Sequence, residues 1–165
     1  MERHTREQSV KKRDVPSSGL RRGNMGISRL LTDVKRWALC EDRIAAVILV
    51  GSYARGEARP DSDVDFVIIT QHARSYVSAP QFTSQFGVCI RKSIEQYGKV
   101  VSIRACYQGG LEVEYGMAEL DWASLPLDVG TRRVLEDGYI ILADKQRVFD
   151  EVTRVISPRD PRHLK

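Results

Sequence analysis

The chain has 165 residues, of which 42% are hydrophobic and 29% are charged, and its formal net charge at pH 7 is +4. This length suits one domain of ordinary size and excludes two large ones. The longest apolar run, residues 44–50, is far shorter than the roughly 20 residues that a membrane-spanning helix needs. The polar first residues also differ from a signal peptide. We therefore expect a cytoplasmic protein with no membrane partner.

The excess positive charge lies entirely near the N-terminus. Residues 1–25 contain seven Lys/Arg and three Asp/Glu, whereas the remaining residues contain 19 of each sign. A polar segment of this composition predicts a disordered basic leader. We expect one domain over residues 26–157 and a tail over residues 158–165. Because residues 26–165 together have no net charge, we do not expect a nucleic-acid partner.

The cysteines are too few and too scattered to predict a metal or redox centre. Cys40, Cys89 and Cys106 lie far apart, and no pair has the spacing of a zinc clip or a redox motif. We expect reduced thiols rather than a disulfide or a zinc site.

The first part of the domain alternates between helical and strand patterns. Apolar residues recur at helical spacing over residues 27–39, which predicts an amphipathic helix. Residues 44–50 are apolar on both faces and indicate a buried strand. A glycine–serine step then leads into a short helical turn and a loop over residues 53–62. Residues 64–70 predict a second strand.

The second part predicts a hairpin and further helices and strands. Residues 100–107 and 111–115 have strand patterns separated by a glycine-containing turn. Residues 81–87 fit either a helix or a loop. The other expected elements are a helix over residues 128–137 with Asp128 as N-cap, a strand over residues 139–143 and a helix over residues 146–156. Together these patterns predict an α+β (α/β-like) fold, in which helices flank a mixed β-sheet.

The residues most suited to chemistry follow the first strand. Gly51-Ser52 ends that strand before a helical turn, so it offers backbone N–H groups and a hydroxyl to phosphate oxygens. Asp63 and Asp65 are separated by one residue at the start of the next strand, so both carboxylates point to the same side. A divalent cation relieves their repulsion, and oxygen ligands favour Mg²⁺ or Mn²⁺. The alternative is a solvated turn that leads into a strand.

A resemblance to a known family begins at residue 51. The stretch GSYARGEARPDSDVD over residues 51–65, followed by an apolar strand, resembles the signature of the nucleotidyltransferase (polymerase β-like) superfamily. It is most similar to the small prokaryotic branch of minimal and aminoglycoside nucleotidyltransferase-like proteins. The segment after Ile156 is too short for the separate helical substrate domain that larger relatives add. The resemblance therefore implies the nucleotidyltransferase fold without that domain.

The resemblance also implies roles for the matching residues. Gly51 and Ser52 would hold the β- and γ-phosphates of a nucleoside triphosphate, with ATP as the expected donor. Asp63 and Asp65 would bind Mg²⁺ or Mn²⁺, and a third carboxylate from a neighbouring strand normally completes the set.

Two glutamates are candidates for the third carboxylate. Glu112 and Glu114 project to one face of the strand over residues 111–115. We expect Glu114 to complete the site, because it lies deeper in the strand and further from the hairpin turn, with Glu112 as the alternative. The other interpretation is that this face of the strand is simply exposed to solvent.

Two arginines and a tryptophan are further candidates. Arg55 and Arg59 are expected one helical turn apart, where they would bind the triphosphate or the departing pyrophosphate. Ion pairs with Glu57 or Asp61 are the alternative. Trp122 would stack on a base or pack in the core, and core packing is the expectation for a lone tryptophan.

The expected activity is metal-dependent transfer of a nucleoside monophosphate from a nucleoside triphosphate to a hydroxyl acceptor, with Asp63, Asp65 and Glu114 as catalytic residues. The acceptor would be a small molecule, such as an aminoglycoside-like compound, or a protein. A homodimer or a separate helical protein is the expected partner. Two alternatives are an antitoxin-like module of a toxin–antitoxin pair that acts on such a helical partner, and a non-catalytic nucleotide-binding domain.

Overall fold

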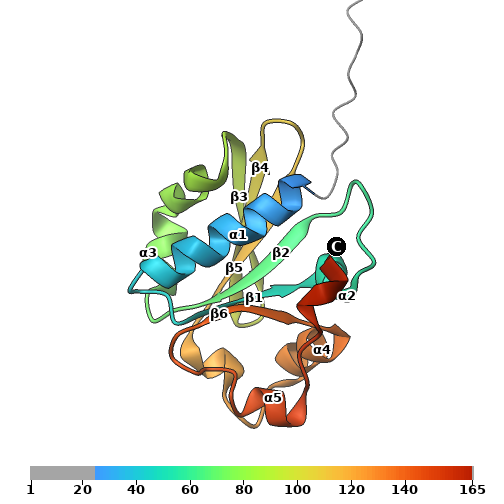
Figure 1. Ribbon diagram of the computed structural model, residues 1–165. Coiled ribbons are helices and arrows are strands. Elements are labelled where there is room, and N and C mark those ends of the chain that lie inside the picture. The colour runs from blue at the N-terminus through green and yellow to red at the C-terminus, as the bar shows by residue number, and fades with distance from the viewer. Residues whose placement is uncertain (1–24, 165) are drawn as a thin grey trace, which may run out of the picture.

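The computed structural model describes residues 25–164, which form one mixed β-sheet with helices packed on it (Figure 1). Apart from Met25, the leader expected over residues 1–25 lies outside the described residues. The strands are β1 Ala46–Val50, β2 Val64–Ile69, β3 Cys89–Tyr97, β4 Val100–Tyr107, β5 Glu112–Ala118 and β6 Ile140–Asp144. The α-helices are α1 Met25–Cys40, α2 Gly51–Arg55, α3 Ala73–Ser78, α4 Val129–Asp137 and α5 Val152–Val155. The 3₁₀ helices are η1 Pro80–Phe86, η2 Leu120–Ala123 and η3 Pro161–Leu164.

The sheet has the strand order β3-β4-β5-β2-β1-β6. β2 and β5 run parallel, and the other neighbouring strands run antiparallel. The predicted mixed sheet with flanking helices is therefore confirmed. Among residues 25–164, none of the helices has the length and the apolar content needed to cross a bilayer.

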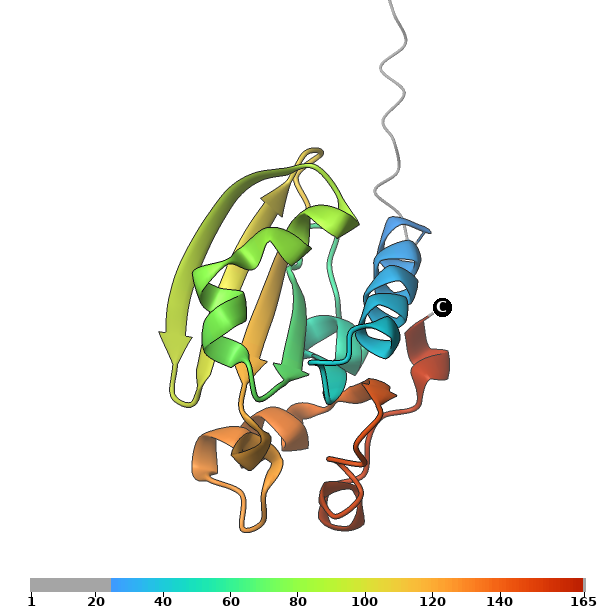
Figure 2. The same cartoon turned by 90° about the vertical axis from the view of Figure 1, so that its left-hand side faces the viewer.

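One face of the sheet forms the larger core. Alternate side chains of β2, β4 and β5, such as Phe66, Ile103 and Tyr115, point to this face and are almost fully buried. α1, α3 and η1 lie on this side of the sheet (Figure 2). Trp37 of α1 stacks on Phe82 of η1 with 5.0 Å between the ring centroids. The amphipathic pattern of α1 thus supplies one wall of the core.

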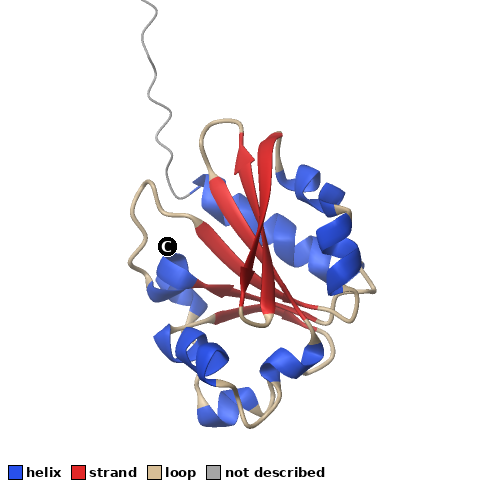
Figure 3. Ribbon diagram, turned by 180° about the vertical axis from the view of Figure 1, so that it is seen from behind, coloured by secondary structure: helices blue, strands red, loops and turns tan. Residues whose placement is uncertain are grey.

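The opposite face is divided into a buried zone and an open zone. Below β1 and β6 it packs on η2, α4 and α5 through a second cluster that includes Ile48, Leu135, Tyr139 and Phe149. Figure 3 shows β4 and β5 from behind with no described helix lying over them. The open zone is where strand side chains are free to be polar.

One strand lies where the sequence predicts none. β3 is an edge strand, and most of its side chains are exposed, so its sequence lacks the apolar alternation on which strand prediction depends. It pairs with β4 along the length of both strands. β5 also continues to Ala118, three residues beyond the expected end.

The C-terminal segment differs more from expectation. The helix expected over residues 146–156 is wrong for most of its length, because only α5 is an α-helix there. The carboxylate of Asp144 accepts hydrogen bonds from the backbone N–H groups of Val148 and Phe149, which replaces a helical turn with a loop. After Ile156 the chain returns to the domain, and Leu164 packs against the larger core.

Candidate active site

A row of charged side chains crosses the open face of the sheet from β4 to β2. In the strand register, Arg104 of β4 lies opposite Glu114 of β5, and Glu114 lies opposite Asp65 of β2. Paired strands are about 4.8 Å apart, so the three side chains are direct neighbours. The structure therefore brings Asp65 and Glu114 together from segments far apart in the sequence.

Further carboxylates border this row. Glu112 is two positions before Glu114 in β5, so strand alternation places it on the same face. Asp63 immediately precedes β2 and reaches the same group of side chains through Arg104. Of the two candidates, Glu114 is the one paired in register with Asp65. Glu112 lies at the rim, next to the hairpin turn.

The guanidinium of Arg104 connects these carboxylates. Its Nη1 donates to Asp63 at 3.0 Å and to Glu112 at 3.1 Å, and its Nη2 donates to Glu114. Its Nε lies 3.6 Å from a carboxylate oxygen of Glu95 in β3. Burial opposes the charged form of Arg104, but the charges of Glu114 and Asp63 outweigh burial and raise the pKa of the guanidinium.

Asp65 stands apart from this network, since it makes no ion pair with any other residue in the 25–164 range. Burial, followed by the charges of Glu114 and Asp63, raises the pKa of Asp65 to about 7. Burial also raises the pKa of Glu114, against the lowering effect of Arg104. Titratable groups perturbed in this way gather at functional sites. The charged form of Asp65 is therefore disfavoured in this environment.

Gly51 brings the turn after β1 directly against Asp65. Its φ is +72°, a left-handed conformation that favours glycine. A Cβ atom at this position would lie 2.3 Å from Oδ2 of Asp65, so a side chain here would displace the carboxylate. Ser52 follows at the start of α2. The expected phosphate-binding step thus lies beside the carboxylates of Asp63, Asp65, Glu112 and Glu114, which we call the acidic row.

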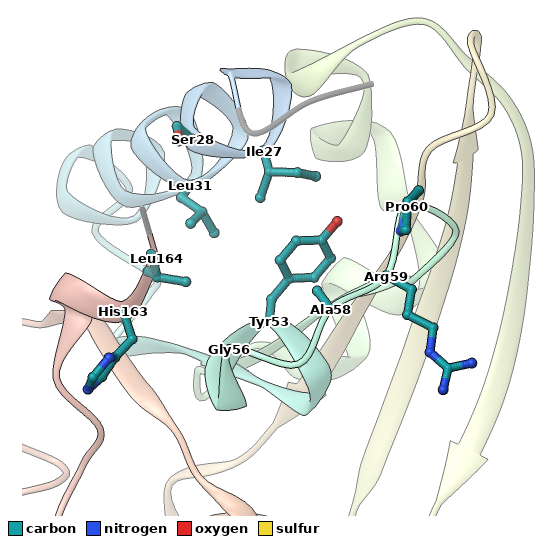
Figure 4. A pocket seen from close by; sticks show the side chains of 10 residues that line it. All are labelled: Ile27, Ser28, Leu31, Tyr53, Gly56, Ala58, Arg59, Pro60, His163 and Leu164. Atoms are coloured by element: carbon teal, nitrogen blue, oxygen red, sulfur yellow. The ribbon is translucent and has the colours of Figure 1, made fainter. Parts of the chain in front are cut away.

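The two candidate arginines are not arranged as the sequence predicts. α2 ends at Arg55 because Gly56 is left-handed, with φ +72°, so Arg55 and Arg59 do not share a helix face. Arg55 instead donates to Glu57 at 3.1 Å, which is the ion pair considered as the alternative. Arg59 is exposed, and its side chain points away from the pocket shown in Figure 4.

Pockets lie on both sides of the acidic row. One, of about 480 Å³, is bordered by Asp65 and Glu114. Ser102 also lines it, and the Ser102 hydroxyl is buried without a hydrogen-bond partner in the described part of the chain. Another, of about 750 Å³, is bordered by Asp63 and Glu112. The acidic row is therefore open to two molecules approaching from different sides.

A third pocket, of about 260 Å³, lies between α1, the loop after α2 and η3 (Figure 4). Ile27, Leu31, Tyr53 and Leu164 make much of its lining apolar, and no carboxylate lines it. We assign no chemistry to it. Trp122 is 3% exposed and packs in the second core cluster, as expected for a lone tryptophan.

The donors in the acidic row fit a divalent cation in kind and in charge. Carboxylate oxygens are the ligands that Mg²⁺ and Mn²⁺ prefer. One guanidinium is surrounded by the carboxylates of several neighbouring residues: Asp63, Asp65, Glu95, Glu112 and Glu114. Within the described range, however, no three acidic, histidine or cysteine side chains stand at metal-binding spacing. Arg104 is the group that lies between them.

A comparison with protein families agrees with this arrangement. The model of the nucleotidyltransferase domain matches residues 27–112, just over half of the chain. The chain belongs to the nucleotidyltransferase domain family. The matched part of this nucleotidyltransferase domain contains the Gly51-Ser52 step, Asp63 and Asp65, and it ends two residues before Glu114.

Solved structures with similar folds include an aminoglycoside 6-adenyltransferase from Bacillus subtilis, which is 16% identical with a TM-score of 0.46 over 61% of this chain and 36% of that one. Cid1 in complex with the UTP analog UMPNPP is 15% identical with a TM-score of 0.42, over 57% and 30%. An apo CCA-adding enzyme is 16% identical with a TM-score of 0.38, over 84% and 40%. The nucleotidyltransferase domain thus spans 30–40% of the length of these structures. A comparison with curated proteins finds no match.

Sequence reasoning does not single out Arg104 or Glu95 as site residues. The available signal is a charged residue in the otherwise mostly apolar strand over residues 100–107, where alternation turns Arg104 away from Ile103. The partners of Arg104 come from β3, from β5 and from the residue before β2. That strand order is not readable from local patterns.

We expect Gly51→Ala to lower the free energy of unfolding by at least about 1 kcal/mol more than Gly56→Ala. Both glycines have φ +72°, so both substitutions place a side chain in the left-handed region, but only the Cβ at residue 51 would meet Asp65, whereas the space at residue 56 is open. Urea denaturation of the two variants measures the difference. An equal decrease in the free energy of unfolding for both variants would show that the close approach of Gly51 to Asp65 does not affect stability.

We expect Asp65→Asn to stabilise the metal-free protein in a pH-dependent way. The folded-state pKa of Asp65, about 7, lies above the ordinary aspartate value of 3.8, so the folded protein keeps this proton to a higher pH than the unfolded chain does. The wild type therefore loses stability as pH rises from about 4 to about 7. The amount by which the variant exceeds wild type in free energy of unfolding should be small near pH 4, grow until about pH 7 and then level off.

Thermal denaturation in a chelator at several pH values measures this advantage. Asp61→Asn, an exposed aspartate of the preceding loop, is the control and should show no such trend. An advantage of Asp65→Asn that is independent of pH would contradict the assignment.

Proposed function

We propose that this domain catalyses the metal-dependent transfer of a nucleoside monophosphate from a nucleoside triphosphate to a hydroxyl acceptor. The observation that carries the proposal is the register of β2 and β5, which sets Asp65 beside Glu114 on the open face of the sheet. Asp63 and the Gly51 turn adjoin the same point. Membership of the nucleotidyltransferase domain family supports this assignment.

Asp63, Asp65 and Glu114 would hold Mg²⁺ or Mn²⁺. When bound, the cation would activate the acceptor hydroxyl and neutralise the charge of the phosphates. The raised pKa values of Asp65 and Glu114 support this role, because a bound cation would offset the cost of burying the two carboxylates. Glu114 would also be placed to accept the proton of the acceptor hydroxyl, because it borders the same pocket as Asp65 and burial raises its pKa.

Gly51 and Ser52 would bind the phosphates of the nucleotide, for which ATP is the first donor to test. Gly51 leaves the backbone accessible next to Asp65, and the hydroxyl of Ser52 lies one residue further on. Arg59 is exposed in the loop after α2 and is free to approach a phosphate. Arg55 would have to leave Glu57 to do so.

The acceptor would enter the 480 Å³ pocket that borders Asp65 and Glu114. The unpartnered hydroxyl of Ser102 gives a hydroxylated ligand a hydrogen-bond partner within this pocket. This arrangement suits a small hydroxylated molecule, such as an aminoglycoside-like compound, or a protein side chain that reaches into the pocket.

A protein partner is the second candidate, and one observation favours it. The segment from Val88 to Tyr97, which includes the edge strand β3, exposes the apolar side chains of Val88, Ile90 and Ile94. Such an edge is a surface on which a second copy of the chain or a helical protein would pack. The antitoxin-like alternative requires a partner of this kind. The non-catalytic alternative is disfavoured, because Asp63, Asp65 and Glu114 all gather around Arg104 or beside it.

The test combines each nucleoside triphosphate with Mg²⁺ or Mn²⁺ and a panel of hydroxylated acceptors and candidate proteins. We expect one acceptor to gain the mass of a nucleoside monophosphate, measured by mass spectrometry. Asp63→Asn, Asp65→Asn and Glu114→Gln should each lower the rate by about 100-fold or more. Glu119→Gln, an exposed residue just after β5, should not.

Transfer at an unchanged rate in the Asp65 or Glu114 variant would refute the proposed site. A circular-dichroism melt of each variant shows that a lost rate does not come from lost folding.

A further inference from the structure

Arg104 has no role in the reaction as proposed, yet its guanidinium touches the carboxylates of Asp63, Glu112 and Glu114 and approaches Glu95. We infer that Arg104 is an internal counter-ion. Its guanidinium occupies the position in the acidic row at which a divalent ion would bind, and the divalent ion displaces it. This inference rests on the proposed function, which makes the row a metal site.

The geometry of the side chain matches this role. Nη1 bridges Asp63 and Glu112, and Nη2 binds Glu114, so one guanidinium occupies oxygens of two of the three proposed metal ligands. A guanidinium presents its donors in a planar fork that suits carboxylate pairs. Each carboxylate oxygen that accepts from Arg104 has fewer lone pairs free for a metal ion, so the guanidinium competes with the ion for the same carboxylates.

The charges explain why the exchange is feasible. Two cations a few ångströms apart in a half-buried site repel one another, so Arg104 in its present position would lower the affinity of the row for a divalent ion. Arg104 is 27% exposed, and its long stem leaves room to turn toward solvent. Its Nε lacks a hydrogen-bond partner in the described part of the chain, so the guanidinium does not make all the hydrogen bonds that it could.

Asp65 is the ligand that Arg104 leaves free. It borders the 480 Å³ pocket and makes no ion pair with Arg104 or with any other residue of the 25–164 range. An incoming cation can therefore contact Asp65 first and then replace Arg104 at Asp63 and Glu114. The metal-free site stays intact, and the affinity for the metal alone is reduced by the competing guanidinium.

The experiment compares Arg104→Gln with wild type in two measurements: thermal stability in a chelator, and Mn²⁺ affinity by calorimetry without nucleotide. We expect the variant to melt at a lower temperature without metal, because three carboxylates lose their partner. We also expect it to bind Mn²⁺ at least about tenfold more tightly, because the competing charge is gone.

Arg91→Gln is the matched control. Arg91 lies on the neighbouring strand, carries the same charge and stands 4.0 Å from Glu112, but its side chain is 72% exposed. It should change neither measurement appreciably. Arg104→Lys keeps the positive charge but lacks the planar guanidinium, so it should give a Mn²⁺ affinity between those of wild type and Arg104→Gln. This variant provides the test if Arg104→Gln does not fold.

An Arg104→Gln protein that melts lower but binds Mn²⁺ no more tightly than wild type overturns the inference, because Arg104 then has only a structural role. If wild type transfers nucleotides and this result is found, the proposed function stands without the inference. If neither wild type nor the variant binds Mn²⁺, both fail. Mn²⁺ binding by the variant alone supports the inference directly.

Discussion

The crowding of carboxylates on one face of the sheet is the constraint on which the site depends. The parallel pairing of β2 and β5 sets Asp65 next to Glu114, and the approach of β4 adds Arg104. Burial, followed by repulsion from Glu114 and Asp63, raises the pKa of Asp65. Arg104 neutralises one part of the row and leaves the Asp65 part uncompensated. In the proposed function, this imbalance favours the binding of a cation at Asp65.

The rest of the fold provides the stability that offsets the unfavourable burial of these carboxylates. The strands that carry the acids present their other face to a core of large apolar side chains, including Phe66 and Tyr115. β1, next to β2, is buried along its whole length. Because the acids sit on this rigid frame, their spacing is set by backbone hydrogen bonds and not by the acids themselves. An unfavourable cluster is tolerated where the surrounding packing determines its position.

Gly51 links the frame to the phosphate-binding step. A strand that ended in any larger residue would push Asp65 aside, since a Cβ would come within 2.3 Å of the carboxylate. The same residue therefore serves the turn, the close approach to the acid and the start of α2. This coupling explains why Gly-Ser and Asp-x-Asp occur together in the sequence, separated by a loop that returns the chain to the sheet.

The sequence by itself determined the elements whose patterns are local. These are the amphipathic α1, the buried β1, the start of β2, the hairpin of β4 and β5, and the N-cap of α4, where Asp128 accepts from the backbone N–H of Thr131. It also indicated Asp63 and Asp65, which alternation in a strand places on one face, and, through the resemblance to nucleotidyltransferases, Glu114 as the third carboxylate. Only the tertiary structure decided that β5 lies beside β2, that β3 forms the sheet edge and that the guanidinium of Arg104 lies among the carboxylates. Those facts depend on the order of strands in the sheet, which arises from packing between distant segments and leaves no mark in local periodicity.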